Sequence, residues 1–178
     1  MNIMNIETPL GMMVAGAVEQ GICILEFADR PTIEDQFKSL AKLLNVSINE
    51  GHNKHFEILQ QQLSEYFNGK RKEFSLPLFT PGTEFQQSVW NELQRIPYGS
   101  TRSYKQQSIS LNNPGSIRAV ASANGKNRIA IIIPCHRVIG SDGDLTGYAG
   151  GLWRKKWLLD LENSNLKKGG LQTQLFSS

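Results

Sequence analysis

The amino-acid sequence predicts a mixed α/β fold of the α+β kind, in which a small domain with a sheet precedes a mostly helical domain. Three observations predict it. Strand-forming runs separated by a tight turn lie near the N-terminus. Apolar residues recur at helical spacing through most of the remaining chain. Pro81-Gly82 interrupts the pattern, so we expect domains over residues 1–79 and 80–163 and a mobile tail over 164–178.

The N-terminal domain is predicted to begin with a β-hairpin. Met12–Val18 and Ile22–Phe27 favour strands, and the segment Glu19–Gly21 between them favours a turn. Cys23 shares one face of the second strand with apolar residues two and four positions further on. We therefore expect Cys23 to be a small buried hydrophobe rather than a catalyst.

Two amphipathic helices are predicted after the hairpin. Thr32 is a suitable N-cap for the first, whose apolar residues recur every three or four positions. They are Ile33, Phe37, Leu40 and Leu44. The second helix is expected over residues 53–67, with Asn68-Gly69 as its end. Its inward-facing residues are Phe56, Leu59, Leu63 and Phe67.

The C-terminal domain is predicted to begin with a helix at Thr83, which can form a capping box with Gln86. The apolar stripe of this helix is Phe85, Val89, Leu93 and Ile96. Two short helices come next, over about residues 105–111 and 117–123, joined by the turn Asn112–Gly115. This arrangement is typical of a helix-turn-helix.

Small side chains distinguish the second short helix, which beyond Arg118 is mostly alanine. A helix that reads the major groove usually presents long polar side chains to base edges. Small residues with one arginine instead suit close approach to a narrow groove without sequence readout. A packed alanine-rich core helix is the alternative, and it stays open here.

Charge and composition narrow the possible partners. Residues 1–81 carry 7 basic and 10 acidic residues, a net −3, whereas residues 82–178 carry 12 basic and 6 acidic residues, a net +6. A basic second half suggests contact with nucleic acid, and a solvated basic surface is the alternative. No membrane span or secretory signal is recognisable. Two distant cysteines favour free thiols, hence a cytoplasmic protein, and no metal-ligand spacing is seen.

The stretch Ile129–Ile139 combines an apolar run with reactive side chains. Ile129–Ile133 is predicted to be a short buried segment, and a regular strand has to stop at Pro134, which donates no backbone hydrogen bond. Cys135 then lies at the end of a rigid element with His136 beside it. A nearby base favours the nucleophilic thiolate. A core cysteine beside a surface histidine is the alternative on these residues alone.

A Gly-rich loop over residues 140–151 comes next, and it lacks the pattern of a phosphate-binding loop. The loop either lines a pocket for a flat ligand or simply connects two elements. A final helix is predicted over Leu152–Glu162. Its core-facing residues are Trp153, Trp157, Leu158 and Leu161.

Motifs spread over about residues 80–162 resemble one protein family in their order and spacing. They are Pro134–Val138, Pro97–Gly99 with Ser103-Tyr104, Arg118–Val120, Asn124-Gly125 with Asn127, Gly147–Leu152, and Trp157–Leu159 with Glu162. Together they resemble the O6-alkylguanine-DNA alkyltransferases, also called methylated-DNA–protein-cysteine methyltransferases. The N-terminal part loosely resembles the ribonuclease-H-like domain of that family in its length and its hairpin-then-helix pattern.

The resemblance implies direct DNA repair. The protein would flip an O6-alkylguanine, or less often an O4-alkylthymine, out of double-stranded DNA and move its alkyl group irreversibly to Cys135. It would act once, as a monomer without cofactor or metal, bound through the minor groove. By the same resemblance, His136 is the base that acts through a water molecule and Glu162 orients it. Tyr104 helps to extrude and bind the base, and Arg118 fills the gap in the duplex.

The resemblance also assigns the residues around the base. Asn127 ties the helix-turn-helix to the active-site loop. Tyr148 and the loop to Gly150 wall the pocket, and backbone groups near Val138 and Ala149 read the guanine. Ala149 stands where some family members carry a serine hydroxyl, which leaves the range of alkyl groups open. The other positions expected to face DNA are Ala119 and Ala121.

Three rival functions differ in features that the sequence tests. An alkyltransferase-like protein that binds damage without removing it would lack the reactive cysteine, whereas Cys135 is present. A transcription regulator built on this domain would bring additional length and a cysteine cluster. A cysteine hydrolase usually places its Cys and His far apart in sequence, and it would leave the alanine-rich helix unexplained.

Overall fold

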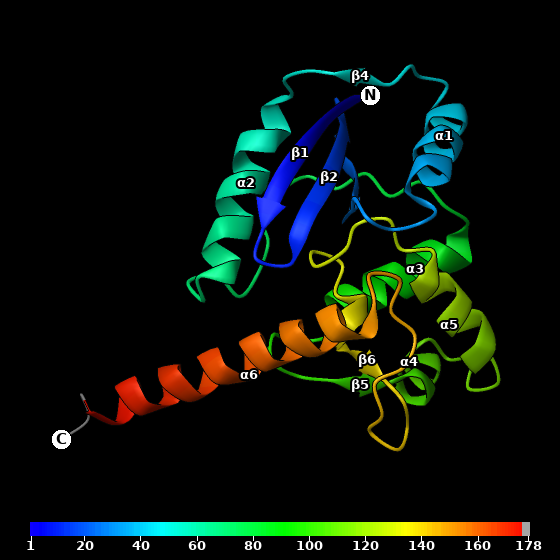
Figure 1. The fold of residues 1–178 in the computed structure, drawn as a ribbon. Helices are drawn as coiled ribbons and strands as arrows, with labels where there is room; N and C mark the ends of the chain where they lie inside the picture. The colour runs from blue at the N-terminus through cyan, green and yellow to red at the C-terminus, as the bar shows by residue number, and fades with distance from the viewer. Residues whose placement is uncertain (176–178) are drawn as a thin grey trace.

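A four-stranded sheet forms most of the N-terminal region in the computed structural model, which describes residues 1–175 (Figure 1). Its strands are β1 (Asn2–Thr8), β2 (Gly11–Val18), β3 (Gly21–Phe27) and β4 (Asn49–Glu50). They lie in the order β3-β2-β1-β4 and are antiparallel, except that β4 pairs in parallel with β1. The predicted hairpin is confirmed as β2 and β3.

Helices α1 (Ile33–Leu44) and α2 (Lys54–Phe67) cover opposite faces of the sheet. Alternate residues of β2 fall into two separate apolar clusters, one completed by α1 and the other by α2. Both helices were predicted from their apolar spacing, and both are confirmed. The mixed α/β class of the fold is therefore confirmed as well.

The ends and faces of these two helices differ in detail from the prediction. Thr32 makes no side-chain capping bond, whereas Asn53 accepts one from His55 N at 3.0 Å. On α2, Tyr66 is fully buried, and Phe67, which we expected to face inward, is only half-buried. The apolar stripe of α2 is therefore rotated toward Tyr66, which has a polar partner in the interior.

Backbone pairing at the edge of β3 joins the two halves of the chain. Ile22 N donates to Pro77 O at 2.9 Å. Leu25 N donates to Arg128 O, and Leu25 O accepts from Ala130 N, each at 2.8 Å. Because a free strand edge exposes unpaired backbone donors and acceptors, these bonds cover the edge and hold the C-terminal region against the sheet.

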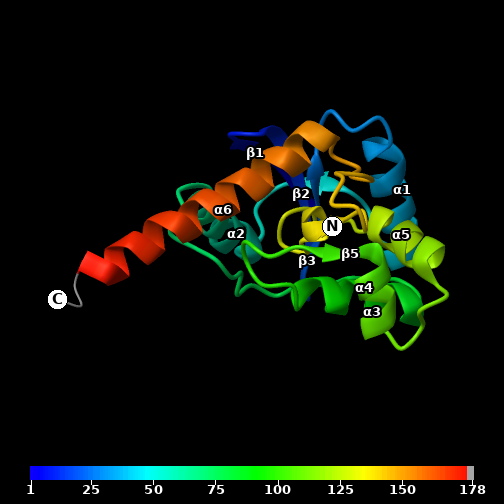
Figure 2. The ribbon, with the colours of Figure 1, turned by 90° about the horizontal axis from the view of Figure 1, so that it is seen from below.

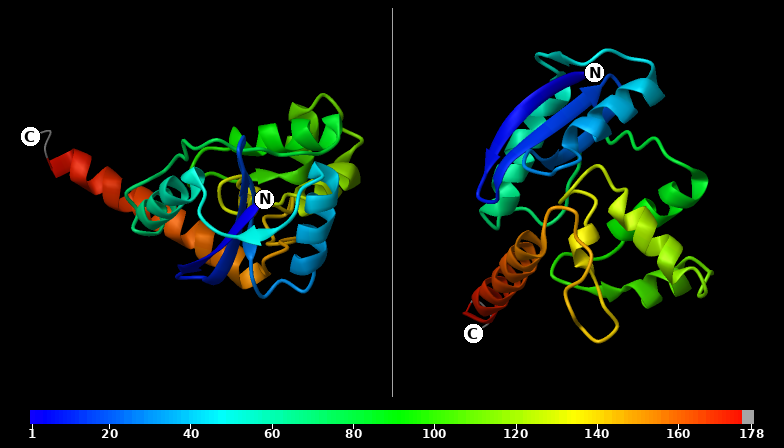
Figure 3. Two further views of the ribbon diagram at one scale, coloured as in Figure 1. Left: turned by 90° about the horizontal axis from the view of Figure 1, so that it is seen from above. Right: turned by 45° about the vertical axis from the view of Figure 1, so that its right-hand side comes forward.

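One apolar cluster runs through both halves. Its members include Phe27 of β3, Leu63 of α2, Val89 of the third helix, Ile133 and Leu158. Figure 3 shows the sheet with its two helices on one side of the molecule and the helices of the C-terminal region on the other. The segment that carries Cys135 therefore lies where the two halves meet.

The C-terminal region begins with three helices, and it contains one small strand pair. They are α3 (Glu84–Gln94), α4 (Tyr104–Ser110) and α5 (Ile117–Gly125), with the parallel pair β5 (Arg102–Ser103) and β6 (Val138–Ile139). Figure 2 shows the three helices grouped at the end of the molecule away from the C-terminus. The two predicted short helices and their connecting turn are present as α4 and α5.

Capping boxes begin α3 and α4. Thr83 Oγ1 accepts from Gln86 N at 3.2 Å, and the Gln86 side chain accepts from Thr83 N at 3.1 Å, as predicted. Ser103 and Gln106 repeat the arrangement at α4 and fix where that helix starts. Ser116 makes no capping bond at α5.

The final helix, α6 (Leu152–Leu175), is longer than expected. We predicted that it ends at Glu162, but it continues, so residues 163–175 of the expected tail are helical. The stretch after Glu162 contains no proline, and its three leucines, two lysines and two glutamines favour helix, against the two glycines at 169 and 170. Residues 176–178 of that predicted mobile tail lie outside the described residues.

The apolar face of α6 includes three of the four residues predicted for it. Leu158 is buried, and Trp157 and Leu161 pack against the core. Trp153, which we expected in the core, is 57% exposed. Its ring instead covers the guanidinium of Arg154, 4.6 Å from the ring centroid.

Candidate active site

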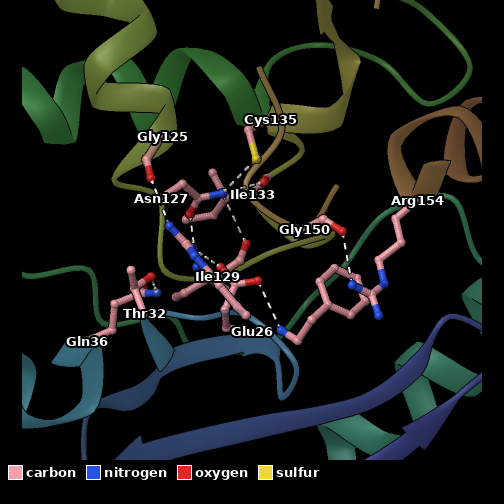
Figure 4. Close-up of polar contacts among 12 residues, drawn as sticks. Glu26, Thr32, Gln36, Gly125, Asn127, Ile129, Ile133, Cys135, Gly150 and Arg154 are labelled. Atoms are coloured by element: carbon pink, nitrogen blue, oxygen red, sulfur yellow. Dashed lines mark hydrogen bonds and ion pairs between the residues drawn. The ribbon is translucent and has the colours of Figure 1, made fainter. Parts of the chain in front are cut away.

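Asn127 shapes the backbone that leads to Cys135. Its Oδ1 accepts from Ile129 N at 3.0 Å, and its Nδ2 donates to Ile133 O at 2.8 Å (Figure 4). The apolar run is buried as predicted, but it forms turns instead of a regular strand, and Ile131 has a φ of 71°. A β-branched residue in the left-handed region is strained. The two Asn127 bonds stabilise this unusual turn.

Cys135 begins a single 3₁₀ turn, η1 (Cys135–Arg137), at the edge of the core. The thiol is half-buried, and Asn127 Nδ2 donates to Cys135 Sγ at 3.4 Å. Burial raises the pKa of Cys135 to about 11, and the bond from Asn127 offsets part of this rise. The pKa of Cys135 is therefore above the ordinary value of a thiol, whereas the sequence suggested a lowered pKa. The thiol is protonated in neutral solution and needs a base before it can attack.

His136 is fully buried, and its partner is the Glu162 that the sequence predicted. His136 Nε2 lies 2.8 Å from Glu162 Oε1. The same carboxylate accepts from the Tyr66 hydroxyl at 2.7 Å and from Gly99 N at 2.8 Å. Glu162 thereby joins α2, the loop after α3, η1 and α6. Burial lowers the pKa of His136, so the imidazole is neutral and able to accept a proton.

Arg137 balances the charge of Glu162. Its Nε and Nη2 each lie 3.0 Å from a carboxylate oxygen of Glu162, and its Nη1 donates to Ile96 O at 2.7 Å. Burial alone raises the pKa of Glu162, but the bonds from His136 and Arg137 outweigh it and lower the pKa from 4.5 to about 2. The carboxylate is therefore ionised at neutral pH.

The pairing with Glu162 determines which of the two ring nitrogens of His136 is free. Because an ionised carboxylate only accepts hydrogen bonds, the neutral ring donates from Nε2 and keeps its lone pair on Nδ1. Among the residues that the structure describes, Nδ1 has no hydrogen-bond partner. Nδ1 is thus the atom through which His136 can take up a proton.

A pocket of ≈ 240 Å³ opens beside Cys135. Its walls come from β3, α4, α5, the turn shaped by Asn127 and the Gly-rich loop, so this loop lines a pocket and does not merely connect two elements. Seven of the twelve predicted site residues line it. They are Tyr104, Ala121, Asn127, Cys135, Tyr148, Ala149 and Gly150.

The other five predicted site residues lie outside the pocket lining. His136 and Glu162 are buried in the pair described above. Val138 is buried at the start of β6. Arg118 and Ala119 are exposed on α5.

Lys155 is a buried cation that the sequence did not single out. Its Nζ donates to Val138 O and to Thr146 O, which joins β6 to the Gly-rich loop. Burial lowers the pKa of Lys155 to about 8. The helical spacing predicts this burial, because Lys155 precedes the core residue Leu158 by three positions and so falls on the buried face of α6.

Neither a metal-binding cluster nor a membrane-spanning helix is found in the described part of the chain. Within residues 1–175, no group of three or more His, Cys, Asp or Glu side chains is arranged to hold a metal ion. No described helix has both the length and the apolar character to cross a membrane. Cys23 and Cys135 are both free thiols, and Cys23 is buried as predicted.

Two family models match nearly the whole chain. The model described as "6-O-methylguanine DNA methyltransferase, ribonuclease-like domain" matches residues 4–80. The model described as "6-O-methylguanine DNA methyltransferase, DNA binding domain" matches residues 84–164. The second match contains Cys135, His136 and Glu162.

Individual relatives agree with these models. A methylated-DNA–protein-cysteine methyltransferase of Methanosarcina barkeri is 45% identical over 91% of this chain and 97% of its own length. A constitutive enzyme of that name from Bacillus subtilis is 42% identical over 91% and 95%. Among solved structures, Mycobacterium tuberculosis OGT in complex with DNA has a TM-score of 0.79 at 39% identity, covering 93% of this chain and 94% of that one.

Proposed function

Because the chain belongs to the methylated-DNA–protein-cysteine methyltransferase family, we propose that it repairs DNA by moving an alkyl group from a damaged base to its own Cys135. One observation carries the proposal. A half-buried thiol lines a small pocket and is followed directly by the buried His136–Glu162 pair. The substrate is O6-alkylguanine in duplex DNA and, to a lesser extent, O4-alkylthymine.

The transfer uses Cys135 as nucleophile and His136 as base. His136 Nδ1 takes the thiol proton through a water molecule, the sulfur attacks the alkyl carbon, and the bond between that carbon and O6 breaks. The departing nucleobase receives the electron pair of the broken bond and a proton, so the products are S-alkylcysteine and guanine. Glu162 orients the imidazole. Since the thioether is not hydrolysed, each molecule acts once and needs no cofactor.

The alkylated oxygen lies inside the base stack, so the damaged nucleotide has to be flipped out, at a cost of a few kcal/mol. Tyr104 lines the pocket, with its hydroxyl 3.2 Å from Gly147 O, and is placed to bind the extruded base. Arg118 is exposed on α5, as a side chain that fills the gap in the duplex has to be.

Helix α5 is suited to the minor groove. Val120 and Ala123 pack inward, whereas Ala119 is exposed and Ala121 is half-exposed, so one face is anchored and the other presents small side chains. Small residues permit close approach to the backbone of DNA. The positive charge of the second half favours phosphate contacts that are independent of sequence.

The remaining site residues hold the pocket. Asn127 has a structural role, because its bonds shape the turn before Cys135. Tyr148 and the loop to Gly150 wall the pocket, and backbone groups near Val138 and Ala149 read the guanine. Val138 O already accepts from Lys155 and keeps a second lone pair.

The organisation of the protein belongs to the same proposal. The two family models meet between residues 80 and 84, which supports domains over residues 1–79 and 80–163. The two free thiols fit a reducing compartment, and we propose a cytoplasmic monomer.

Mass spectrometry of the alkylated protein tests the function. Incubation with duplex DNA that contains O6-methylguanine should add one methyl group to the peptide that carries Cys135, with at most one transfer per protein molecule. Cys135→Ser should abolish transfer and keep most of the affinity for DNA, because the thiol contributes chemistry and little binding energy.

Cys23→Ser is the matched control, since Cys23 is the second free thiol and is buried away from the pocket. This variant should transfer as the unmodified protein does. Methyl label on Cys23 alone, transfer by the Cys135→Ser variant, or many turnovers per molecule would each contradict the proposal.

A further inference from the structure

The N-terminal sheet contributes an acidic residue to the pocket of Cys135. Glu26, at the end of β3, lines this pocket together with Cys135 and residues of α5 and the Gly-rich loop. Its side chain is only 2% exposed. None of the expected catalytic or DNA-binding residues comes from this part of the chain.

Each oxygen of the Glu26 carboxylate has a bonding partner. Glu26 Oε1 accepts from Phe27 N at 3.0 Å, and Oε2 forms an ion pair with Arg30. Arg30 Nη2 also lies 3.5 Å from Gly125 O, the last residue of α5 (Figure 4). The pair therefore joins the sheet, the pocket and the end of the helix proposed to enter DNA.

Charged and titratable groups surround Cys135 from several elements. Glu26 comes from β3, Tyr104 from α4, Tyr148 from the Gly-rich loop and Lys155 from α6, and His136 is the next residue in the chain. Among them, Glu26 is the carboxylate that lines the pocket, and its negative charge opposes the formation of a thiolate. Burial raises the pKa of Glu26, and the ion pair with Arg30 works against that rise and favours the charged form. The positive charge of Lys155 instead lowers the pKa of Cys135 and favours the thiolate.

We propose that Glu26 is a positioning residue of the alkyl-acceptor pocket, supplied by the N-terminal sheet and held in place by Arg30, and that its carboxylate lowers the reactivity of the resting Cys135 thiol. The inference deepens the proposed alkyl transfer and rests on it for its biological meaning. A thiol kept neutral at rest reacts poorly with stray electrophiles, which matters for a residue that can be used only once.

Replacing Glu26 by glutamine removes the charge and keeps the size of the side chain. The pKa of Cys135 should then fall by about 1 unit, the lower end of the range for a nearby charge, because Arg30 already offsets part of it. At any pH below the midpoint, the thiolate fraction and the rate of reaction with iodoacetamide should rise roughly tenfold. The rate is followed by the mass of the peptide that carries Cys135.

Two further variants separate charge from structure. Glu26→Asp keeps the charge and should restore the pH dependence of the unmodified protein. Glu65→Gln removes the acidic partner of another ion pair in the N-terminal region, Glu65–Arg71, which does not line the pocket. It should leave the reactivity of Cys135 unchanged.

The ¹³Cβ chemical shift of Cys135 gives a direct titration. A merely loosened pocket would hydrate the thiol and lower its midpoint in Glu26→Asp as well as in Glu26→Gln, whereas loss of the charge lowers the midpoint in Glu26→Gln alone. An unchanged midpoint in the Glu26→Gln variant, or an equal shift in the Glu65→Gln variant, would overturn the inference. Reaction with iodoacetamide does not need DNA repair activity. Failure of alkyl transfer and failure of this inference are therefore distinguishable.

Discussion

At the scale of single residues, the site depends on Glu162 more than on any other acceptor. This carboxylate is fully buried and binds His136, Arg137, Tyr66 and the backbone of Gly99. A buried ion is tolerated only when its charge and its lone pairs are compensated. Four partners from three separate segments meet that requirement, so the orientation of the imidazole is fixed by the packing of the whole core.

Glu162→Gln should therefore cost about 3 kcal/mol of the free energy of unfolding, because it leaves Arg137 buried without its counter-charge. The folded-state pKa of Glu162 is depressed to about 2. Its contribution is then fully present above the unfolded value near 4.5 and is lost as the pH falls toward 2. Urea unfolding between pH 2 and pH 7 should show this loss in the unmodified protein and a smaller one in the variant.

Glu34→Gln is the control for that experiment, since Glu34 makes an exposed ion pair with Lys38. It should change the stability little at any pH. Equal pH dependence in the unmodified protein and the Glu162→Gln variant would mean that Glu162 is not the group that titrates.

Sequence reasoning found some of these residues and missed others for a physical reason. Cys135, His136 and Glu162 stand in recognisable motifs. Tyr66 looked like one more position on an amphipathic helix, and its hydroxyl has a role only because α2 packs beside α6. Glu26 could not be identified for the same reason, since neither its ion pair nor the pocket that it lines can be predicted from a single acidic residue in an apolar strand.

At the scale of elements, α5 is the helix that we propose links the pocket to DNA. Its inward face packs through Val120 and Ala123, and Trp90 Nε1 of α3 donates to Ala123 O at 2.9 Å. Its outward face carries Arg118. The helix is thus anchored without using the side chain that is proposed to enter the duplex.

Arg118→Ala should slow repair of a paired O6-methylguanine by roughly tenfold or more, because the flipped state loses the group that replaces the extruded base, at a cost of a few kcal/mol. Reaction with a free O6-alkylguanine base should change little, since no duplex has to be opened. Single-turnover rates on both substrates measure the difference.

Lys38→Ala, which removes an exposed cation of α1, is the matched control and should affect neither rate strongly. An equal loss on duplex and free base after Arg118→Ala would place Arg118 in the chemistry or the stability of the protein and exclude the gap-filling role.

Helices could be predicted better than strands because the pattern that indicates a helix is local in sequence, whereas the partners that stabilise a strand lie elsewhere in the chain. Helices α1, α2 and α3 and the Thr83 capping box follow from local patterns, and they are confirmed, although the stripe of α2 is rotated toward Tyr66. Strand β1 was missed because only Ile6 of its seven residues is buried, and its stability comes from seven residue pairs with β2. Pairing partners of that kind lie outside any local pattern.

At the scale of the whole molecule, Arg154 holds the two halves together beside the pocket. The side chain is 6% exposed and lies on the ring of Phe27, with 4.1 Å between its Cζ and the ring centroid. Its Nε donates to Leu10 O at 3.0 Å, its Nη1 and Nη2 bind Asp29 at 2.9 and 2.7 Å, and Nη1 also donates to Gly150 O at 3.0 Å. One guanidinium therefore links the sheet to the loop that walls the pocket.

Arg154→Ala should lower the free energy of unfolding by about 2 kcal/mol, the scale of lost hydrogen bonds to a charged group. It should also slow alkyl transfer, because Gly150 loses its link to the sheet. Lys156→Ala, two residues further along α6 and exposed, is the control and should do neither. Urea unfolding and single-turnover rates measure both effects. If Arg154→Ala destabilises the protein but transfers at the normal rate, the pocket wall is held by Lys155 and the loop itself, and the link between the halves serves stability alone.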